Sequence, residues 1–369
     1  NRANPNSHVG HIRSSNLCVT GDTKILTKEY GYIEIEKVSG QTLECWNGKE
    51  WSLTELFRTD DGYGQKVLTV KLSDNSVIEA TPYHRWQVQN EYGKAPVIKR
   101  TSELLPGDKL VKFDVPVIPH GIKELKNAYE SGFLTADGTV LNENRVRISL
   151  YDKKEQLLEY FNDYMTKTMT KASDFGGQST NLLYDSSVLL PKFEIPSNEY
   201  TLESRLRWLE GYLDGDGTLL ESDSIQVASV NTRFLSNLKL MLQELGIHTN
   251  ISLLQEEGYC MLPANDGTGL DKEYYCQERY RMLIPGSQVS KLMSLGFNPN
   301  RVKPNYREHS RESINFMKVV SVKDENKICY TYCGNEPKNH TLMFNGHLTM
   351  NCTEIFQNTE PNHYMVKLY

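Results

Sequence analysis

The stretch CVTGDTKILT (residues 18–27) opens the first part of this 369-residue chain that has the pattern of a folded domain. Short β-branched or alternating runs follow it up to about residue 118, among them GYIEI, KVLTVKL and VIEAT. Turn signals such as DDGYG and LSDNS separate these runs. Closely spaced strands divided by turns predict an all-β domain over residues 18–118. The same pattern returns over residues 313–351, in FMKVVSVKD, ICYTYC and HTLMFNG.

The middle of the chain has a different character. VPVIPHG (115–121) contains two prolines and predicts a linker. Helical periodicity then appears in four segments, at residues 122–138, 152–169, 201–217 and 231–246, with strand-like runs between them. The order α-β-α-β-β occurs twice, which is an internal repeat. We therefore expect an α/β domain over residues 119–312 that interrupts one β domain, because the short final β piece cannot bury a core alone.

Residues 1–17 and 352–369 lack a periodic apolar pattern and are too short to fold alone. The formal net charge is −6, and the seven cysteines have irregular spacings without a CxxC pair. Neither a structural zinc site nor a disulfide framework is expected. No apolar run approaches the ~18–20 residues that span a membrane. We therefore expect a soluble, cytoplasmic, monomeric protein without a membrane partner.

Three reactive side chains stand at the two ends of the β domain. The Cys18 thiol can attack the carbonyl before it and convert that amide into a thioester, if the fold strains the peptide and activates the thiol. The Asn351 side chain can attack its own carbonyl and break the chain. Cys352, next in the sequence, can accept an acyl group from the thioester. These reagents stand in the order needed to cut out residues 18–351 and join the flanks.

The segment from Cys18 to Asn351 resembles an intein, a self-splicing protein insert. CVTGDTKILT is similar to the family's first block, and ATPYHRWQV (80–88) to its Thr-x-x-His block, with Thr81 and His84. The end of the segment is similar to the last two blocks, in which His340 would polarise the second junction. The resemblance implies the all-β Hint (horseshoe) fold and splicing without a cofactor. It assigns seven residues to the reaction: Cys18, Thr81, His84, Cys333, His340, Asn351 and Cys352.

Two positions depart from the family pattern. Cys333 stands where the family usually has an aspartate, and Met350 stands where it usually has a histidine. Asparagine cyclisation would then rely on His340 and on backbone groups. Each motif alone is commonplace, since a single cysteine is usually a small buried hydrophobe and Asn-Gly is usually a turn. Their conjunction, in order and at both ends of one β domain, favours splicing.

The joined flanks would read HIRSSNLCTEIFQNTEPNHY. The string Asn-Leu-Cys-x-Glu resembles the active-site loop of the large subunit of ribonucleotide reductase. The resemblance implies that the host is a ribonucleoside-diphosphate reductase whose site would include Asn16, Cys352 and Glu354. An unspliced host would then be inactive, because its loop is divided.

The two repeats contain ESGFLTADG (130–138) and LEGYLDGDG (209–217). Small residues let two such helices pack closely, which would bring Asp137 and Asp216 together. Adjacent carboxylates repel each other unless a divalent metal ion lies between them. These segments resemble the paired motifs of LAGLIDADG homing endonucleases. The resemblance implies Mg²⁺-dependent hydrolysis of double-stranded DNA, at the uninterrupted site in the host gene.

Further endonuclease residues follow from the same resemblance. LLPKFEIP suggests Lys192 as a catalytic lysine of the first half. NPNRVKP suggests Lys303 in the second half, with Arg301 or Lys291 as alternatives. Four arginines lie on predicted strands in pairs two residues apart, so that each pair points to one face and could contact DNA: Arg145, Arg147, Arg279 and Arg281.

Two alternatives remain open from the sequence. The first is an autoprocessing domain of the hedgehog kind, which also begins with cysteine and uses Thr-x-x-His but joins no flanks. The Asn351-Cys352 pair argues against it, because such domains need no downstream junction. The second is a DNA-binding module whose endonuclease residues are vestigial. Both aspartates are present, which argues against this alternative.

Overall fold

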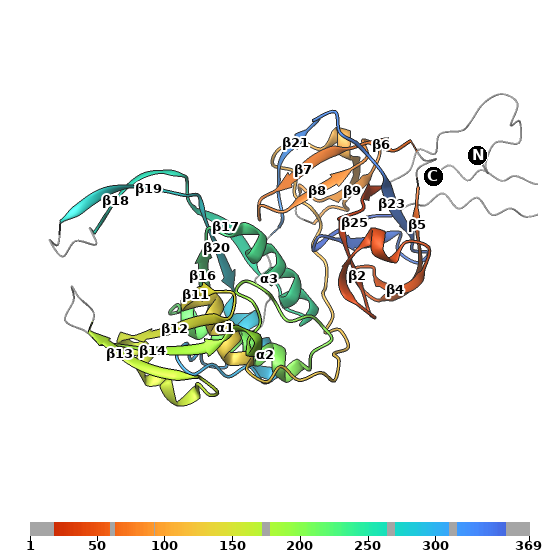
Figure 1. Ribbon diagram of the computed structural model, residues 1–369. Coiled ribbons are helices and arrows are strands. Elements are labelled where there is room, and N and C mark those ends of the chain that lie inside the picture. Colours follow the sequence, from red (N-terminus) through yellow and green to blue (C-terminus); the bar gives the residue numbers. More distant parts are fainter. Residues whose placement is uncertain are drawn as a thin grey trace, which may run out of the picture. The chain divides into compact units, whose positions relative to one another are not determined.

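The computed structural model describes residues 18–59, 63–91, 93–171, 178–263, 270–309 and 316–351. The chain divides after Val115 and after Ile314 into two compact units. The β unit comprises the described residues of 18–115 and 316–351, and its strands come from both ends of the sequence (Figure 1). The inserted unit comprises the described residues of 116–309. The first division lies close to the expected boundary after residue 118, and the expected boundary after residue 312 lies outside the described residues.

The β unit is built on one eleven-stranded sheet. Its strand order is β21 (Val319–Lys323), β7 (Leu68–Leu72), β8 (Val77–Ala80), β1 (Val19–Thr20), β23 (Thr331–Asn335), β5 (Trp51–Arg58), β4 (Thr42–Trp46), β2 (Lys24–Thr27), β24 (Thr341–Phe344) and β25 (His347–Met350), with β3 (Gly31–Glu34) beside β2. Two small pairs join β9 (Arg85–Val88) to β10 (Val97–Arg100), and β6 (Gln65–Lys66) to β22 (Ile328–Cys329). The short 3-10 helices η2 (Ile35–Val38) and η3 (Thr101–Glu103) complete it.

Alternation in the sequence explains these strands. In β7, LTVKL, every second side chain is buried, and β5 shows the same alternation. The buried side chains form one core that includes Leu56, Val70, Ile78, Trp86 and Phe344. At roughly 25 cal/mol per Å² of apolar surface, this burial is the main force that holds the sheet together.

The two sequence pieces of the β unit share this sheet. Strand β1 lies between β8 and β23, with Val19 opposite both Ala80 and Tyr332. The chain also leaves and re-enters this unit at neighbouring points. The Gly107 amide donates to the Val319 carbonyl at 2.8 Å, and the Val319 amide donates to the Asp108 carbonyl at 2.9 Å. Neither piece is a complete domain, as the sequence predicts.

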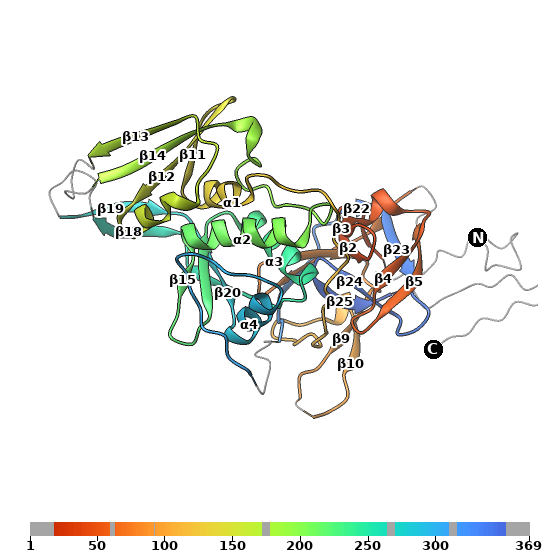
Figure 2. The same cartoon turned by 90° about the horizontal axis from the view of Figure 1, so that it is seen from below.

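The inserted unit consists of two similar halves, shown from below in Figure 2. The first contains α1 (Ala128–Asp137), β11 (Gly138–Asn142), β12 (Arg145–Tyr151), η4 (Asp152–Tyr160), β13 (Thr166–Lys171), β14 (Gln178–Asp185) and η5 (Ser186–Val188). The second contains α2 (Leu202–Asp216), β15 (Thr218–Leu219), β16 (Ile225–Ser229), α3 (Thr232–Glu244), β17 (Asn250–Gln255), β18 (Gly258–Pro263), β19 (Asp271–Cys276), β20 (Arg279–Ile284) and α4 (Gly286–Ser294). The sheet orders are β11-β12-β14-β13 and β15-β16-β20-β17, and β18 and β19 form a two-stranded arm (Figure 1).

Helices α1 and α2 join the two halves and pack side by side (Figure 2). Two glycines permit the close approach of their backbones. A Cβ atom on Gly132 would lie 1.9 Å from the Trp208 carbonyl oxygen, and one on Gly211 would lie 2.0 Å from the Tyr129 carbonyl oxygen. No side chain fits at either position, which explains the small residues of the repeated motif.

Three details of the predicted secondary structure are wrong. The helix expected over 152–169 is a 3-10 helix that ends at Tyr160, and strand β13 follows it. Asp163 has a left-handed backbone with φ 55°, which breaks the helix. Helix α1 begins at Ala128 and not at residue 122. The first half has the order α-β-β-helix-β-β and the second the order α-β-β-α-β-β-β-β-α, so the expected α-β-α-β-β omits β11, β15, the β18–β19 arm and α4.

No helix within the described ranges is both long and apolar enough to cross a membrane.

Candidate functional site

Cys18 is fully buried, at 0% exposure, at the start of β1. Its amide nitrogen donates to Thr81 Oγ1 at 3.3 Å, and the Thr81 amide donates to the Cys18 carbonyl oxygen at 2.9 Å. Thr81 therefore holds both backbone polar groups of Cys18. The Cys18 nitrogen belongs to the peptide bond that the sequence marks as the first junction.

The Cys18 side chain packs against Cys333 and Phe57. This contact follows from strand register, because β1 pairs with β23 through Val19 and Tyr332. The Cys333 thiol is buried and lies 3.5 Å from the Gly334 carbonyl oxygen. The structure thus brings together Cys18, Thr81 and Cys333, as the motifs predict.

His84 is fixed by its backbone and by its ring. Its amide donates to the Thr81 carbonyl oxygen at 3.0 Å. The buried ring lies against Trp86, with centroids 5.4 Å apart, and against Phe344 at 6.3 Å. Ring atom Nε2 lies 3.0 Å from Thr349 Oγ1, within hydrogen-bonding distance. Sequence reasoning did not single out Thr349.

Asn351 is the last described residue and is fully buried, at 0% exposure. Its amide donates to the His340 carbonyl oxygen at 2.9 Å, so His340 reaches Asn351 through its backbone. The side-chain Nδ2 of Asn351 donates to the Glu336 carbonyl oxygen at 3.0 Å. The reacting amide nitrogen of Asn351 is therefore held in one orientation. His340 adopts a left-handed backbone, with φ 54°.

Glu336 is a buried carboxylate that no sequence motif identifies. Its oxygens accept from the backbone amides of Lys338 at 2.9 Å and Asn339 at 2.8 Å. Asn47 Nδ2 donates to it at 3.2 Å. Burial alone would raise the pKa of Glu336, but these hydrogen bonds outweigh burial and hold that pKa below its usual value. The carboxylate therefore stays ionised and fixes the turn that carries His340.

Met350 is buried and brings no imidazole to the second junction. His347 does not replace the missing histidine. Its Nε2 lies 2.8 Å from Ser76 Oγ and 3.1 Å from Asp74 Oδ2. In the β24–β25 hairpin His347 stands at the turn end, and Met350 at the other end, about 10 Å away at ~3.3 Å per residue. The remaining predicted residues of this site, Asn16, Cys352 and Glu354, lie outside the described residues.

In the inserted unit, Asp137 and Asp216 are the last residues of α1 and α2. An ideal Cβ atom on Gly215 would lie 3.8 Å from Asp137 Oδ2, so the Asp137 carboxylate borders the last turn of α2. Burial and then the charge of Asp137 raise the pKa of Asp216 to about 6. The two predicted aspartates are thus adjacent and repel each other.

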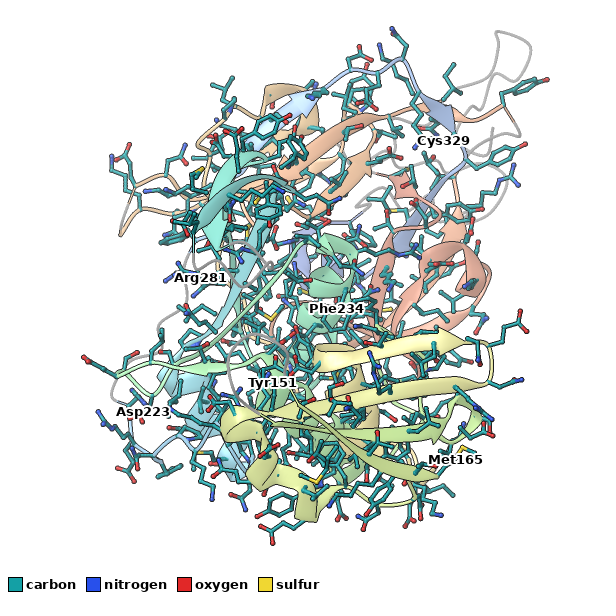
Figure 3. All side chains as sticks on the ribbon, turned by 60° about the vertical axis from the view of Figure 1, so that its left-hand side comes forward. Tyr151, Met165, Asp223, Phe234, Arg281 and Cys329 are labelled. Atoms are coloured by element: carbon teal, nitrogen blue, oxygen red, sulfur yellow. The ribbon has the colours of Figure 1, made fainter. Side chains whose placement is uncertain are left out.

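Two residues that the sequence did not suggest contact Asp137. The Tyr151 hydroxyl donates to Asp137 Oδ1 at 3.1 Å, and Figure 3 labels Tyr151. The Lys154 ammonium forms an ion pair with Asp137 Oδ2. Lys154 also lies near enough to lower the pKa of Asp216. A positive charge from the start of η4 therefore partly neutralises the pair of carboxylates.

Lys192 and Arg301 occupy equivalent places in the two halves. Lys192 Nζ donates to the Gly138 carbonyl oxygen at 2.6 Å, and Arg301 Nη2 donates to the Gly217 carbonyl oxygen, also at 2.6 Å. Gly138 and Gly217 are the C-caps of α1 and α2. Burial lowers the pKa of Lys192, and the opposing pull of the two aspartates is weaker. Arg301, and not the exposed Lys303, is therefore the structural counterpart of Lys192.

Asp214 explains how Arg301 reaches this place. Its buried carboxylate accepts from the backbone amides of Asn300 and Arg301, each at 2.7 Å, and from the Tyr129 hydroxyl at 2.9 Å. Thr135 does the same in the first half, where its Oγ1 accepts from the Phe193 amide at 3.3 Å. Asp214 is thus an anchor for the second-half loop. In the sequence, Asp214 lies within LEGYLDGDG (209–217), and the motif predicts no role of its own for it.

The predicted DNA-contacting arginines lie on the two sheets. In β12, Arg145 and Arg147 are exposed on the same face as Tyr151, and the residues between them are buried. In β20, Arg279 is exposed and donates to Gln255 Oε1 at 3.1 Å. Arg281, labelled in Figure 3, is half-buried on the same face. Each pair shares one face of a sheet, as the two-residue spacing predicts.

The second half, which contains α2 and its terminal aspartate, is similar to a known family. Residues 203–280 match the LAGLIDADG-like domain family. This LAGLIDADG-like segment begins in α2 and ends in β20, so it covers most of the second half.

One relative aligns with almost the whole chain. It is the ribonucleoside-diphosphate reductase large subunit of Invertebrate iridescent virus 6, which is 34% identical over 366 residues. The alignment covers 95% of this chain and 37% of the relative, so this chain spans little more than a third of that protein.

Two solved structures give partial superpositions. The N-terminal LAGLIDADG domain of DUF199/WhiA aligns with a TM-score of 0.31 and 13% identity, over 50% of this chain and 86% of that one. The MchDnaB-1 intein aligns with a TM-score of 0.20 and 26% identity, over 25% of this chain and 66% of that one.

The residues at the ends of the LAGLIDADG-like helices fit a magnesium ion. Asp137 and Asp216 offer the hard carboxylate oxygens that Mg²⁺ prefers, and their repulsion would be relieved by a divalent cation. Among the described residues there is no group of three or more potential acidic, His or Cys ligands. Two carboxylates without a closed cage suit an ion that also binds a substrate phosphate.

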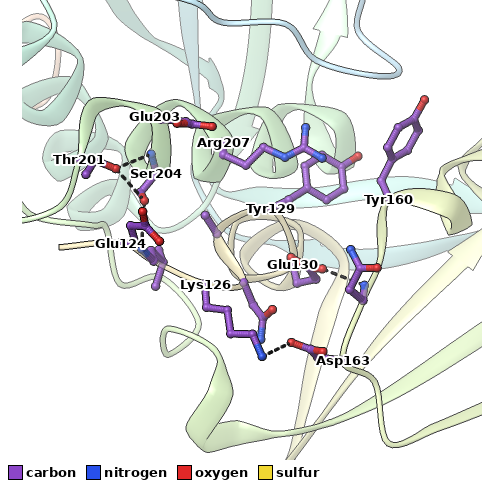
Figure 4. A pocket seen from close by; sticks show the side chains of 14 residues that line it. Glu124, Lys126, Tyr129, Glu130, Tyr160, Asp163, Thr201, Glu203, Ser204 and Arg207 are labelled. Atoms are coloured by element: carbon purple, nitrogen blue, oxygen red, sulfur yellow. Dashed lines mark hydrogen bonds and ion pairs between the residues drawn. The ribbon is translucent and has the colours of Figure 1, made fainter. Parts of the chain in front are cut away.

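A pocket of about 690 Å³ lies at the other end of the same helices (Figure 4). It is lined by the N-terminal residues of both helices, among them Tyr129 and Arg207. Lys126 and Asp163 pair across its wall at 2.8 Å. None of the predicted site residues lines it, so this cavity is separate from the predicted splicing and endonuclease sites.

Proposed function

We propose that this chain is a splicing precursor. Residues 18–351 excise themselves and join Leu17 to Cys352, and the inserted unit cuts double-stranded DNA. The single observation that carries the first part is the arrangement at the two ends of the β unit. Cys18 and Asn351 are both fully buried in one unit, although 351 − 18 = 333 positions separate them. A hydrogen bond holds the Cys18 backbone nitrogen, which belongs to the first scissile bond, and another holds the Asn351 side-chain nitrogen.

The first step is attack of the Cys18 thiol on the Leu17 carbonyl carbon. The peptide C–N bond breaks, and the Cys18 nitrogen takes up the proton that the thiol loses. Thr81 holds that nitrogen through its Oγ1, and His84, whose amide is bonded to the Thr81 carbonyl, is the candidate proton donor. The thiol of Cys352 then takes the acyl group from Cys18 by thioester exchange.

The second cleavage belongs to Asn351. Its Nδ2 attacks its own carbonyl carbon, the bond to Cys352 breaks, and a succinimide remains on the excised segment. The hydrogen bond that Nδ2 donates to the Glu336 carbonyl oxygen favours this nitrogen as the nucleophile. The freed amine of Cys352 finally attacks its own thioester and leaves an ordinary peptide bond between Leu17 and Cys352.

The host of this precursor is a ribonucleotide reductase large subunit. The viral relative carries that name and aligns over 95% of this chain, far beyond the 17 + 18 = 35 flanking residues. The inserted segment therefore has a counterpart inside a reductase. After joining, Asn16, Cys352 and Glu354 would belong to one host loop.

An intact-mass time course of the purified chain in reductant tests splicing. We expect a species of residues 18–351 and a joined 35-residue peptide, both absent from the Cys18→Ala chain. Release of the flanks without the joined peptide would support the hedgehog-type alternative. A wild-type mass that never changes would contradict the proposal.

The inserted unit is proposed to be a homing endonuclease that recognises the uninterrupted host gene. The neighbouring Asp137 and Asp216, at the ends of a LAGLIDADG-like helix pair, support this second activity. Bound Mg²⁺ would stabilise the attacking and leaving oxygens of the phosphodiester. Arg145, Arg147, Arg279 and Arg281 would contact the phosphates or base edges of DNA.

Cleavage of DNA that carries the joined host sequence tests this activity. We expect two fragments with Mg²⁺ and none with a chelator. The Asp216→Asn chain should bind the DNA but leave it intact. A Lys303→Ala chain should keep its activity, because Lys303 is exposed and Arg301 is the residue that reaches the end of α2. DNA binding without cleavage by the wild-type chain would support the vestigial alternative.

A further inference from the structure

Thr349 makes a contact that the proposed reaction does not yet use. It lies in β25, two residues before Asn351, and is buried. Yet its Oγ1 is 3.0 Å from Nε2 of His84, which belongs to the machinery of the other junction. A side chain beside the second junction thus touches the histidine of the first.

The orientation of His84 depends on this contact. The backbone of His84 is fixed, since its amide donates to Thr81 and its carbonyl accepts from the Thr101 amide at 2.7 Å. The ring can still rotate about its side-chain bonds, and the aromatic neighbours Trp86 and Phe344 restrict its plane without choosing a tautomer. The hydrogen bond at Nε2 fixes the direction in which the ring faces, and the threonine hydroxyl can hold either tautomer there because it can donate or accept.

We propose that Thr349 is a positioning residue for the first cleavage. By engaging Nε2, it fixes the orientation of the His84 ring, so that Nδ1 is the nitrogen that would serve the Cys18 amide. This inference rests on the proposed splicing function. It adds that the first step is fast only when β25 is docked, which makes the two junctions interdependent.

The test isolates the first step in the full chain. An Asn351→Ala background blocks the second cleavage, and added dithiothreitol releases the N-terminal flank at a rate set by the thioester. In this background Thr349→Val removes the hydroxyl at nearly constant volume. We expect flank release to slow by about 5- to 100-fold, between the loss of one hydrogen bond and the loss of acid catalysis.

Two further variants separate positioning from folding. Thr349→Ser keeps the hydroxyl and should restore release to within about threefold of the parent. Thr341→Val is the matched control. It also removes a buried threonine hydroxyl from the same hairpin, one that donates to the Asn47 carbonyl at 2.7 Å, and it should leave the rate within about threefold.

A spectroscopic readout completes the test. In ¹⁵N-histidine-labelled chain, Thr349→Val should shift the His84 ring nitrogen resonances, and Thr341→Val should not. Equal slowing by both valine variants, an unchanged rate in Thr349→Val, or failure of serine to rescue would each overturn the proposal. If the Asn351→Ala parent itself releases no flank, the proposed splicing function fails as well, and the resonances still show whether the Thr349–His84 bond exists.

Discussion

Glu336 lies in a short turn and bonds both to that turn and to the Asn351 side chain. Its carboxylate is buried and accepts hydrogen bonds from Asn47 and from the backbone amides of Lys338 and Asn339. Its backbone carbonyl accepts from the Asn351 side chain. One residue therefore orders the turn before His340 and orients the nucleophile of the second junction.

Replacing Glu336 with Gln should destabilise the β unit. In this variant the side-chain NH₂ group would face the N–H donors that now bond to the carboxylate. We therefore expect the free energy of unfolding at pH 7 to fall by about 1–3 kcal/mol. Because the folded pKa of Glu336 is depressed, its stabilisation is present above the unfolded value of about 4.3 and is lost as pH falls through the folded pKa. Denaturant unfolding at pH 7 and below pH 4 measures both effects.

The matched control for this prediction is Glu50→Gln. Glu50 forms an exposed ion pair with Lys338 of the same turn, so its loss should cost under about 1 kcal/mol. A Glu336→Gln chain as stable as wild type at pH 7 would contradict the role of the buried carboxylate.

Lys154 should compete with a divalent cation for Asp137. Its ammonium already pairs with that carboxylate, and a metal ion would have to displace it. We expect Lys154→Met to tighten Ca²⁺ or Mn²⁺ binding by about tenfold, the equivalent of one modest ion pair. Titration calorimetry measures this without any DNA. The neighbouring Lys153→Met, at an exposed position, should change nothing, and weaker binding by Lys154→Met would refute the competition.

At this scale the sequence identifies residues whose chemistry belongs to a motif, such as Cys18, Thr81, His84 and the two aspartates. It does not identify Glu336, Thr349, Lys154 or Asp214. Their importance comes from partners brought close by the fold, such as His84 for Thr349, 265 positions away. A threonine in a strand and a lysine in a polar turn carry no local signal for such contacts.

Helices α1 and α2 act as one element, because each presents a glycine to the backbone of the other. This contact sets the separation of the two carboxylates at the helix ends. Any atom inserted there must push the helices apart, since the obstacle on each side is a main-chain carbonyl and not a flexible side chain.

Gly132→Ala should therefore damage the inserted unit selectively. Overpacking against the Trp208 carbonyl should cost about 1–3 kcal/mol and move Asp137 from Asp216. We expect lower thermal stability of this unit and loss of DNA cleavage, with splicing retained. Glu203→Ala, at an exposed position of α2, is the control and should preserve both activities. A Gly132→Ala chain that cuts DNA normally would show that the helix spacing is not critical.

Element prediction succeeded where the pattern was strong, as in α2, and failed over 152–169. There the apolar spacing indicated a helix, but Phe161 packs edge-on against Phe133 at 5.1 Å and Asp163 turns the chain into a strand. The amide of Asn162 donates to Glu130 in α1 at 2.9 Å. Tertiary contacts therefore overrode the local helical preference.

Considered as a whole, the chain carries the inserted unit between two segments of the β unit that are hydrogen-bonded to each other. The Leu110 amide donates to the Met317 carbonyl at 2.8 Å, next to the bonds between residues 107–108 and Val319. The described residues that flank the insertion, 107–110 and 317–319, are thus neighbours. Replacing residues 116–314 with a flexible linker of about six residues, which can reach ~20 Å, should leave the β unit able to fold and splice.

Mass spectrometry of this shortened chain measures the prediction, through appearance of the joined 35-residue peptide. The same deletion in a Cys18→Ala chain should release nothing. A shortened chain that is unfolded by circular dichroism would show that the β unit depends on the insertion for its stability. The organisation into an interrupted β domain was predictable from the sequence, because neither β piece alone could bury a core.

The pairing of β1 with β23 also has a consequence for synthesis on the ribosome. Val19 contacts Tyr332, which is made 332 − 19 = 313 residues later. At about 5–20 residues per second, ribosomes need roughly 15–60 seconds to make that stretch. During this interval strand β23 has not yet been made, and Cys18 lacks the contact with Cys333 that β23 supplies. The Cys18 thiol therefore has no assembled site in which to react. If the chain splices as proposed, this delay keeps the first junction intact until the downstream flank exists.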